Sequence, residues 1–157
     1  YSAQAPLDVH PEIGNNSLLA RALGLEIEGR FGSWRGLDEI GVWSAVDLSL
    51  DELTGRIGSV CDTQPFVIRG GPTHVRRVGI ITGGADSSIE DAHAAGLDTF
   101  VTGEGSHHSF HDAMELGVNV VYAGHYATEV LGVKSLAELL ARRFDLSWSF
   151  VDHPTGL

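Results

Sequence analysis

The sequence predicts a mixed α/β protein in which a largely parallel sheet is flanked by helices. Between residues 75 and 151, short apolar runs of strand length alternate with segments of helical spacing. Such alternation is typical of βα units, which build parallel or mixed sheets. The run over 118–123 is dominated by apolar residues, as expected of a strand that is buried on both faces. A chain of 157 residues is long enough to form one domain with a substantial core.

Five segments are predicted before residue 75. Asn15 and Asn16 can cap the first helix, and Asp51 and Glu52 suit the first turn of the second. The segments are a helix over 15–23, a Gly- and Arg-rich connector over 29–36, a strand over 42–46, a helix over 50–60, and an edge strand with a turn over 65–72. Because Gly-rich stretches bracket residues 34–74, this part could form a small inserted lobe.

From residue 75 the alternation is regular. Gly96 and Gly117 are suitable helix ends, because glycine readily adopts the left-handed conformation found there. The expected elements are a strand over 75–82, a helix from Asp86 or Ser87 to Gly96, a strand over 98–102, a helix over 106–116, a strand over 118–123, a short helix after Gly124, an amphipathic helix over 133–144 and a strand over 148–151.

Charge and cysteine content limit the classes of function. With 10 Lys and Arg against 21 Asp and Glu, the net charge of -11 argues against a nucleic-acid binder, which needs cations to neutralise phosphates. Cys61 is the only cysteine, so an intrachain disulfide and a cysteine-based zinc site are excluded. No apolar run approaches the length of a membrane span. We therefore expect a cytoplasmic protein that acts on a small molecule.

The first candidate site follows the strand over 98–102, at an edge where α/β sheets bind ligands. Glu104, His107, His108 and His111 lie there within eight residues. If the helix begins near residue 105, Glu104, His108 and His111 share one face. Imidazoles and a carboxylate gathered in this way suit metal binding or proton transfer. The alternative is a solvated helix end that histidines merely decorate.

A second candidate follows the strand over 118–123. His125 and Glu129 are four residues apart, so one helical turn places both on one face, as a pair of metal ligands requires. The alternative is a capping turn with a chance His–Glu hydrogen bond. Asp8 could supply a further carboxylate ligand near the N-terminus, although by itself it is equally explained as a turn residue.

The last candidate is the turn over 83–88, which joins a strand to a helix. Backbone N–H groups of Gly83, Gly84 and Ser87 could attract an anionic group there. The sequence matches neither the P-loop nor the dinucleotide fingerprint, and a tight βα turn capped by Asp86 explains it as well.

Taken together, four motifs resemble the Nif-three-like dinuclear-metal-centre proteins, which are type-2 homologues of GTP cyclohydrolase I. The motifs are Leu7-Asp8 with His10-Pro11-Glu12 and Gly14-Asn15-Asn16, then Thr102-Gly103-Glu104 with His111, then Ala123-Gly124-His125 with Thr128-Glu129, and finally Phe150-Val151-Asp152. The similarity runs along the whole chain and is strongest over 1–25 and 75–157.

The resemblance implies a toroidal homohexamer with two divalent metal ions per full-length subunit, which could be Zn, Mn, Fe, Co or Ni. It assigns Asp8 as a bridging ligand and His125 with Glu129 as a ligand pair. Glu104 and His111 would line the same cleft and bind substrate or move protons. His107 and His108 fall in that motif without a defined role.

Two departures from the family pattern are evident. The resemblance implies that the chain lacks an N-terminal segment carrying two further histidines, and Gln4 stands where a histidine is common. The expected function is a metal-dependent hydrolase acting on a nucleotide-like or cyclic-amide substrate. The alternative is a non-enzymatic hexameric scaffold that binds or handles metal and binds partners.

Overall fold

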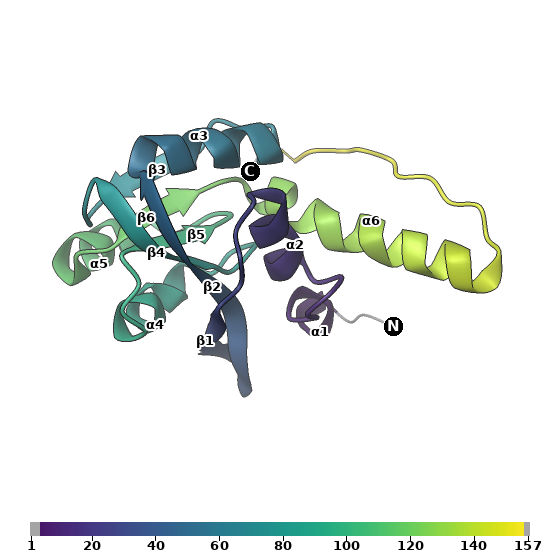
Figure 1. Ribbon diagram of the computed structural model, residues 1–157, viewed down its shortest axis with the longest axis horizontal. Helices are drawn as coiled ribbons and strands as arrows, with labels where there is room; N and C mark the ends of the chain where they lie inside the picture. The colour runs from purple at the N-terminus through teal and green to yellow at the C-terminus, as the bar shows by residue number, and fades with distance from the viewer. Residues whose placement is uncertain (1–3, 156–157) are drawn as a thin grey trace.

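The structure is a computed structural model that describes residues 4–155, and a six-stranded mixed sheet forms the centre of this part (Figure 1). The strands are β1 (Gly29–Trp34), β2 (Leu37–Ser49), β3 (Phe66–Arg69), β4 (His74–Ile80), β5 (Thr99–Thr102) and β6 (Asn119–Tyr122), in the order β1-β2-β4-β5-β6-β3. Strands β4, β5 and β6 pair in parallel, and the other three pairings are antiparallel. The mixed α/β class is confirmed, although the parallel share is smaller than expected.

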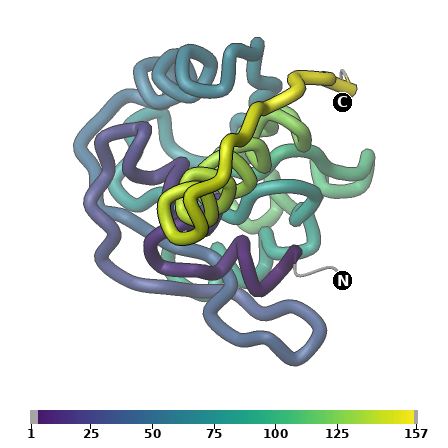
Figure 2. Tube along the Cα trace, turned by 90° about the vertical axis from the view of Figure 1, so that its right-hand side faces the viewer, coloured from purple at the N-terminus to yellow at the C-terminus, as the bar shows by residue number. Residues whose placement is uncertain are grey.

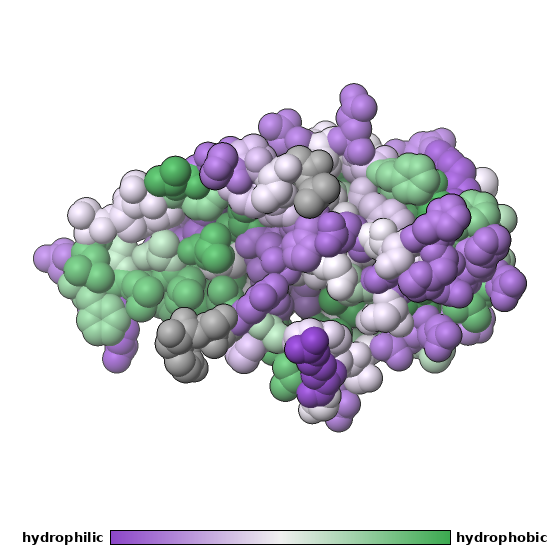
Figure 3. Space-filling view, turned by 180° about the vertical axis from the view of Figure 1, so that it is seen from behind, coloured by the Kyte–Doolittle hydropathy of each residue, from purple (hydrophilic) through white to green (hydrophobic). Residues whose placement is uncertain are grey.

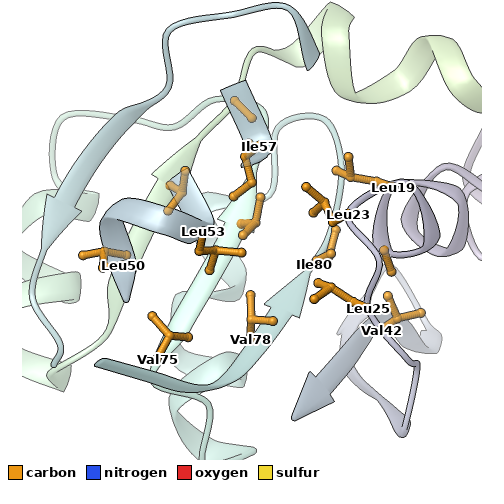
Figure 4. Close-up of a cluster of buried hydrophobic side chains, with 14 residues drawn as sticks. Leu19, Leu23, Leu25, Val42, Leu50, Leu53, Ile57, Val75, Val78 and Ile80 are labelled. Carbon is orange, nitrogen blue, oxygen red and sulfur yellow. The ribbon is translucent and has the colours of Figure 1, made fainter. Parts of the chain in front are cut away.

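Helices cover both faces of the sheet. They are α1 (Gln4–Asp8), α2 (Asn15–Ala22), α3 (Leu50–Cys61), α4 (Ile89–Ala94, after a short 3-10 turn over Asp86–Ser88), α5 (Ser109–Leu116) and α6 (His125–Phe144). Helices α2 and α3 pack on one face (Figure 4), and α4 and α5 pack on the other. Successive residues of a strand point to opposite faces. Accordingly, Val101 and Val121 join the first cluster, whereas Phe100 and Val120 join the second.

In the first half of the chain, the structure differs from two predictions. The expected connector over 29–36 is strand β1 with a hairpin turn, and residues 34–74 supply β2 and β3 to the common sheet and α3 to one of its faces instead of forming a separate lobe. Arg35 and Gly36 have positive φ values of 48° and 82°, which suit a two-residue hairpin. Gly29 packs against the Trp43 indole, where a Cβ would lie 2.5 Å from Nε1. Gly29 therefore reflects close packing within a strand pair, and Gly36 reflects the hairpin turn.

In the C-terminal part, the structure differs from two further predictions. The two helices expected after Gly124 form a single helix, α6, of 20 residues, and residues 148–151 form no strand. Helix α6 extends away from the sheet, and the chain then turns back along it (Figures 1 and 2). Among the helices of residues 4–155, none has both the length and the apolar composition of a membrane span.

Candidate functional site

Three loops meet where the parallel strands β4, β5 and β6 end. They carry Gly83, Gly103 and Gly124, and their backbones are joined directly. The N–H of Gly103 donates to the carbonyl of Gly83 at 2.7 Å, and the N–H of Gly124 donates to that of Gly103 at 2.9 Å. This places His125, the first residue of α6, at the edge where open α/β sheets bind ligands.

Glycine is required at two of these positions because other groups approach very closely. A Cβ on Gly103 would lie 2.6 Å from the Cα of His125 and 2.7 Å from the carbonyl oxygen of Gly83. Gly83 has a φ of +77°, and its Cβ would lie 2.3 Å from the Oε1 atom of Glu129. Because these glycines carry no side chain, His125 and Glu129 of α6 can lie close to the backbone of the loops that follow β4 and β5.

His125 lies between two carboxylates. Its Nδ1 atom is 2.9 Å from Oε1 of Glu104, and its Nε2 atom is 3.3 Å from Oε2 of Glu129. Burial lowers the pKa of His125, but the hydrogen bond with Glu104 and the charges of Glu129 and Glu104 outweigh it, so the pKa lies above its usual value. Without a bound cation, a protonated imidazole satisfies both carboxylates.

Asp8 ends helix α1 beside the same group. It borders a cavity of about 360 Å³ that His125 and Glu129 also line. Burial is the largest influence on the pKa of Asp8 and raises it from 3.8 to about 6, helped by the charge of Glu129 and opposed by a hydrogen bond from Asn15. The three side chains to which the resemblance assigns metal binding thus line one cavity.

Asn15 and Asn16, which the sequence predicts as helix caps and as part of the first family motif, hold parts of the site in place. Both are buried. Asn15 donates from Nδ2 to Oδ1 of Asp8 at 2.7 Å and accepts at Oδ1 from the N–H of Gly132 in α6 at 2.6 Å. Asn16 accepts from the N–H and the hydroxyl of Thr82, both at 2.8 Å. Two adjacent asparagines are the sequence signal for such a role, but a sequence pattern does not show which partners they bind, because Thr82 and Gly132 are distant in the sequence.

The histidines of the first candidate site lie elsewhere. Helix α5 begins at Ser109, so Glu104 is not part of that helix and contacts His125 instead. His107, His108 and His111 are exposed and line neither of the two cavities that His125 borders. The shared face expected for Glu104, His108 and His111 is therefore wrong, because the loop after β5 continues for six residues before the helix begins.

The turn over 83–88 borders the same cavity as Asp8. Gly84 and Ser87 line it, and Gly83 packs against Glu129. The N–H of Gly83 already donates to Oγ1 of Thr128 and that of Ala85 to Oγ1 of Thr102. Anion binding by Gly83 through this N–H would require breaking an internal hydrogen bond, whereas for Gly84 and Ser87 it stays a prediction.

The donor set fits a divalent cation of borderline character. Asp8 and Glu129 offer carboxylate oxygens and His125 an imidazole nitrogen, the ligand types that zinc, manganese and iron accept. Within residues 4–155, no group of three or more His, Cys, Asp and Glu side chains is gathered closely enough to hold an ion. These residues therefore fit as contributors to a metal site rather than as a closed site.

The raised pKa of Asp8 predicts a pH-dependent stability. Because the folded pKa of about 6 exceeds the ordinary value of 3.8, the folded state binds more protons between these values, and stability falls as the pH rises through this window. In chelator-treated protein, Asp8→Asn should raise the free energy of unfolding at pH 8 by about 1 kcal/mol, allowing for partial exposure, and change it little at pH 4. Urea denaturation measures both, with the exposed Asp38→Asn as control. An equal gain at both pH values would contradict the prediction.

Comparison with known proteins identifies clear relatives. The model of the family Duf34/NIF3 (NGG1p interacting factor 3) matches residues 1–155. A GTP cyclohydrolase 1 type 2 homolog of Deinococcus radiodurans is 45% identical across the whole chain, and one of Archaeoglobus fulgidus is 34% identical. The chain spans 60% of the length of the first and 62% of the second.

Solved structures show the same similarity. A protein of Thermus thermophilus, TTHA1606, matches the whole chain with a TM-score of 0.83 and 41% identity, and the match covers 62% of its own length. Reduced HcgD from Methanocaldococcus jannaschii matches 94% of the chain with a TM-score of 0.76 and 30% identity, over 58% of its length. The fold described above is therefore shared with several solved structures.

Proposed function

This chain belongs to the Duf34/NIF3 family, and on that premise we propose that Asp8, His125 and Glu129 contribute to a divalent-metal site of a metal-dependent hydrolase. The observation that carries the proposal is the placement of His125 between Glu104 and Glu129 on a cavity that also holds Asp8. The names of the relatives support a nucleotide-like or cyclic-amide substrate. The proposed complement is two divalent ions per full-length subunit.

The residues of the chain have distinct roles in this proposal. A divalent ion, when bound, supplies the Lewis acidity that polarises the bond to be hydrolysed. A carboxylate only accepts hydrogen bonds, so with an ion bound Glu104 would accept from the Nδ1–H of His125, which would leave the lone pair of Nε2 available to the ion beside Glu129. Glu104, which is 47% exposed, is also placed to take up or release a proton at the edge of the site.

The metal content of the purified chain tests the proposal. His125→Ala removes one ligand and should lower metal affinity by about tenfold or more, because ligand and supporting residues of metal sites have effects of that size. Mass spectrometry of the gel-filtered protein measures the bound metal. His93→Ala, an exposed histidine in α4, is the matched control and should leave the metal content unchanged. Equal metal in wild type and His125→Ala would refute the role of His125.

A non-enzymatic metal-handling scaffold is the second candidate. His125 and Glu129 border two cavities, and their side chains are 35% and 23% exposed, an arrangement that favours exchange of an ion with a partner. A handling protein should lose its metal readily to a mild chelator, whereas a hydrolytic centre should keep at least one ion. Metal-dependent turnover of a nucleotide or cyclic amide would favour the enzyme.

We also propose that the chain assembles as a homohexamer through α6. Val133, Leu139, Leu140 and Phe144 of this helix are between 39% and 59% exposed, and hydrophobic residues gather where α6 extends (Figure 3). Such a patch commonly marks an interaction surface. In analytical ultracentrifugation, the double variant Leu139→Glu/Leu140→Glu should sediment as a smaller species, whereas the control Leu37→Glu on the hairpin should not. An unchanged mass would exclude this face.

A further inference from the structure

The chain after α6 returns to the beginning of that helix, and its last described residues, 150–155, form a strap across it (Figure 2). Side chains of α6 contact the strap at two positions. The hydroxyl of Tyr126 donates to Oδ1 of Asp152 at 2.8 Å and accepts from the N–H of His153 at 3.0 Å. The ammonium of Lys134, the only lysine of the chain, lies 4.2 Å from the centroid of the Phe150 ring. The strap is therefore attached at both the Tyr126 and the Lys134 positions of α6.

A second cavity, of about 510 Å³, lies between the strap and α6. It shares His125 and Glu129 with the first cavity, so these two residues separate the two spaces. One part of its lining is apolar and comes from Val130, Val133, Phe150 and Val151. Besides the shared His125 and Glu129, polar groups of Glu104, Tyr126, His153 and Thr155 line it. The first cavity holds Asp8 and the glycine turn instead.

We propose that the cavity beneath the strap binds a planar, uncharged heteroaromatic ring of the substrate, such as a nucleobase. An apolar lining with a few polar groups suits such a ring, and the Phe150 ring offers an aromatic face on which it can stack. The carboxylates of Glu104 and Glu129 make this cavity unfavourable for a phosphate, and the charge of Lys134 is engaged by Phe150. Glu104 and His153 can form hydrogen bonds with the edge of the ring.

This inference rests on the proposed function and specifies which side of the site receives the ring. A ring beneath the strap borders His125 and Glu129 directly, whereas the rest of the substrate would extend past this pair towards Gly84 and Ser87. The strap residues thus set the specificity for the ring, and Tyr126 acts as a positioning residue that holds the strap.

Titration of the full chain with guanosine tests the ring site, because guanosine carries a base but no phosphate. We expect binding in calorimetry that Phe150→Ala weakens by about tenfold, the usual scale for losing one base-stacking ring. Phe66→Ala is the matched control, since Phe66 is 65% exposed on β3 and lines neither cavity. Tyr126→Phe keeps the ring of Tyr126 but loses both strap hydrogen bonds, and should weaken binding several-fold without unfolding the chain.

Metal analysis of the same samples separates the two proposals. Phe150→Ala should keep the wild-type metal content, because Phe150 belongs to the strap and is not one of the assigned ligands. Absence of guanosine binding by wild type, or equal binding by wild type and Phe150→Ala, would overturn the ring site while leaving the metal proposal intact. If Phe150→Ala weakens guanosine binding but His125→Ala leaves the metal content unchanged, the ring site would be supported and the metal proposal overturned.

Discussion

Gly103→Ala is expected to lower the free energy of unfolding by about 3 kcal/mol, the largest loss among the variants considered, and to separate the loops that form the site. The added Cβ would meet the Cα and N of His125 at 2.6 and 2.9 Å and the carbonyl oxygen of Gly83 at 2.7 Å. These are backbone atoms held by hydrogen bonds, so no side chain can rotate to make room. His125 must therefore move away from Gly83 and Glu104, and metal binding should fall with stability.

Urea denaturation and metal analysis measure the two effects of Gly103→Ala. Gly55→Ala is the matched control, because Gly55 is exposed in α3 and a Cβ there meets nothing within 4 Å. An alanine in that helix should stabilise the chain by about 0.5–1 kcal/mol. If Gly103→Ala is as stable as wild type, the close approach of the three loops described here is incorrect.

Gly132→Ala should destabilise the chain by about 1–2 kcal/mol, although alanine normally stabilises a helix. Gly132 is buried in α6, and its Cβ would lie 2.8 Å from Oδ1 and 3.0 Å from Cγ of Asn15. Asn15 cannot yield freely, because its amide holds Asp8 at one end and the N–H of Gly132 at the other. We therefore expect metal affinity to fall as well, since Asn15 orients Asp8.

A double-mutant cycle checks this explanation. Asn15→Ala removes the group that the new methyl would meet, so the double variant Asn15→Ala/Gly132→Ala should lose less stability than the sum of the two single variants. The comparison with Gly55→Ala shows the opposite sign for the same substitution in an open helix position. Additive losses would mean that the methyl group is accommodated without moving Asn15.

Local sequence signals predicted many elements of the fold well. Helix α3 spans Leu50–Cys61, as its acidic first turn indicated, and the hydroxyl of Ser49 caps it by accepting from the N–H of Glu52. Gly117 ends α5 with a φ of 69°. The strand over Phe66–Arg69 lies at the edge of the sheet, as its prolines and glycines suggested. These features depend on neighbouring residues, which a sequence pattern reports directly.

The errors arose where distant residues decide the local structure. The glycines of residues 29–36 favour a connector, yet Gly29 and Gly41 lie in a strand pair, where a Cβ would meet the rings of Trp43 and Phe31. The break expected within α6 does not occur, because Gly132 is required by Asn15 and not by a turn. No local pattern distinguishes a glycine that ends a helix from one that lets a side chain from another helix approach.

The mixed α/β class, most of the helices and strands, and the i, i+4 pairing of His125 with Glu129 could be predicted from the sequence, because propensity, capping and helical periodicity act over a few residues. The contact of His125 with Glu104, rather than with the histidines near it, could not be predicted in this way, nor could the placement of Asp8 and of the strap over 150–155 beside the same pair. The residues involved are distant in the sequence, such as Asp8 and Glu129, whose charges interact. They depend on how the parallel strands align their ends and on where α6 crosses α2, which packing of the whole core determines.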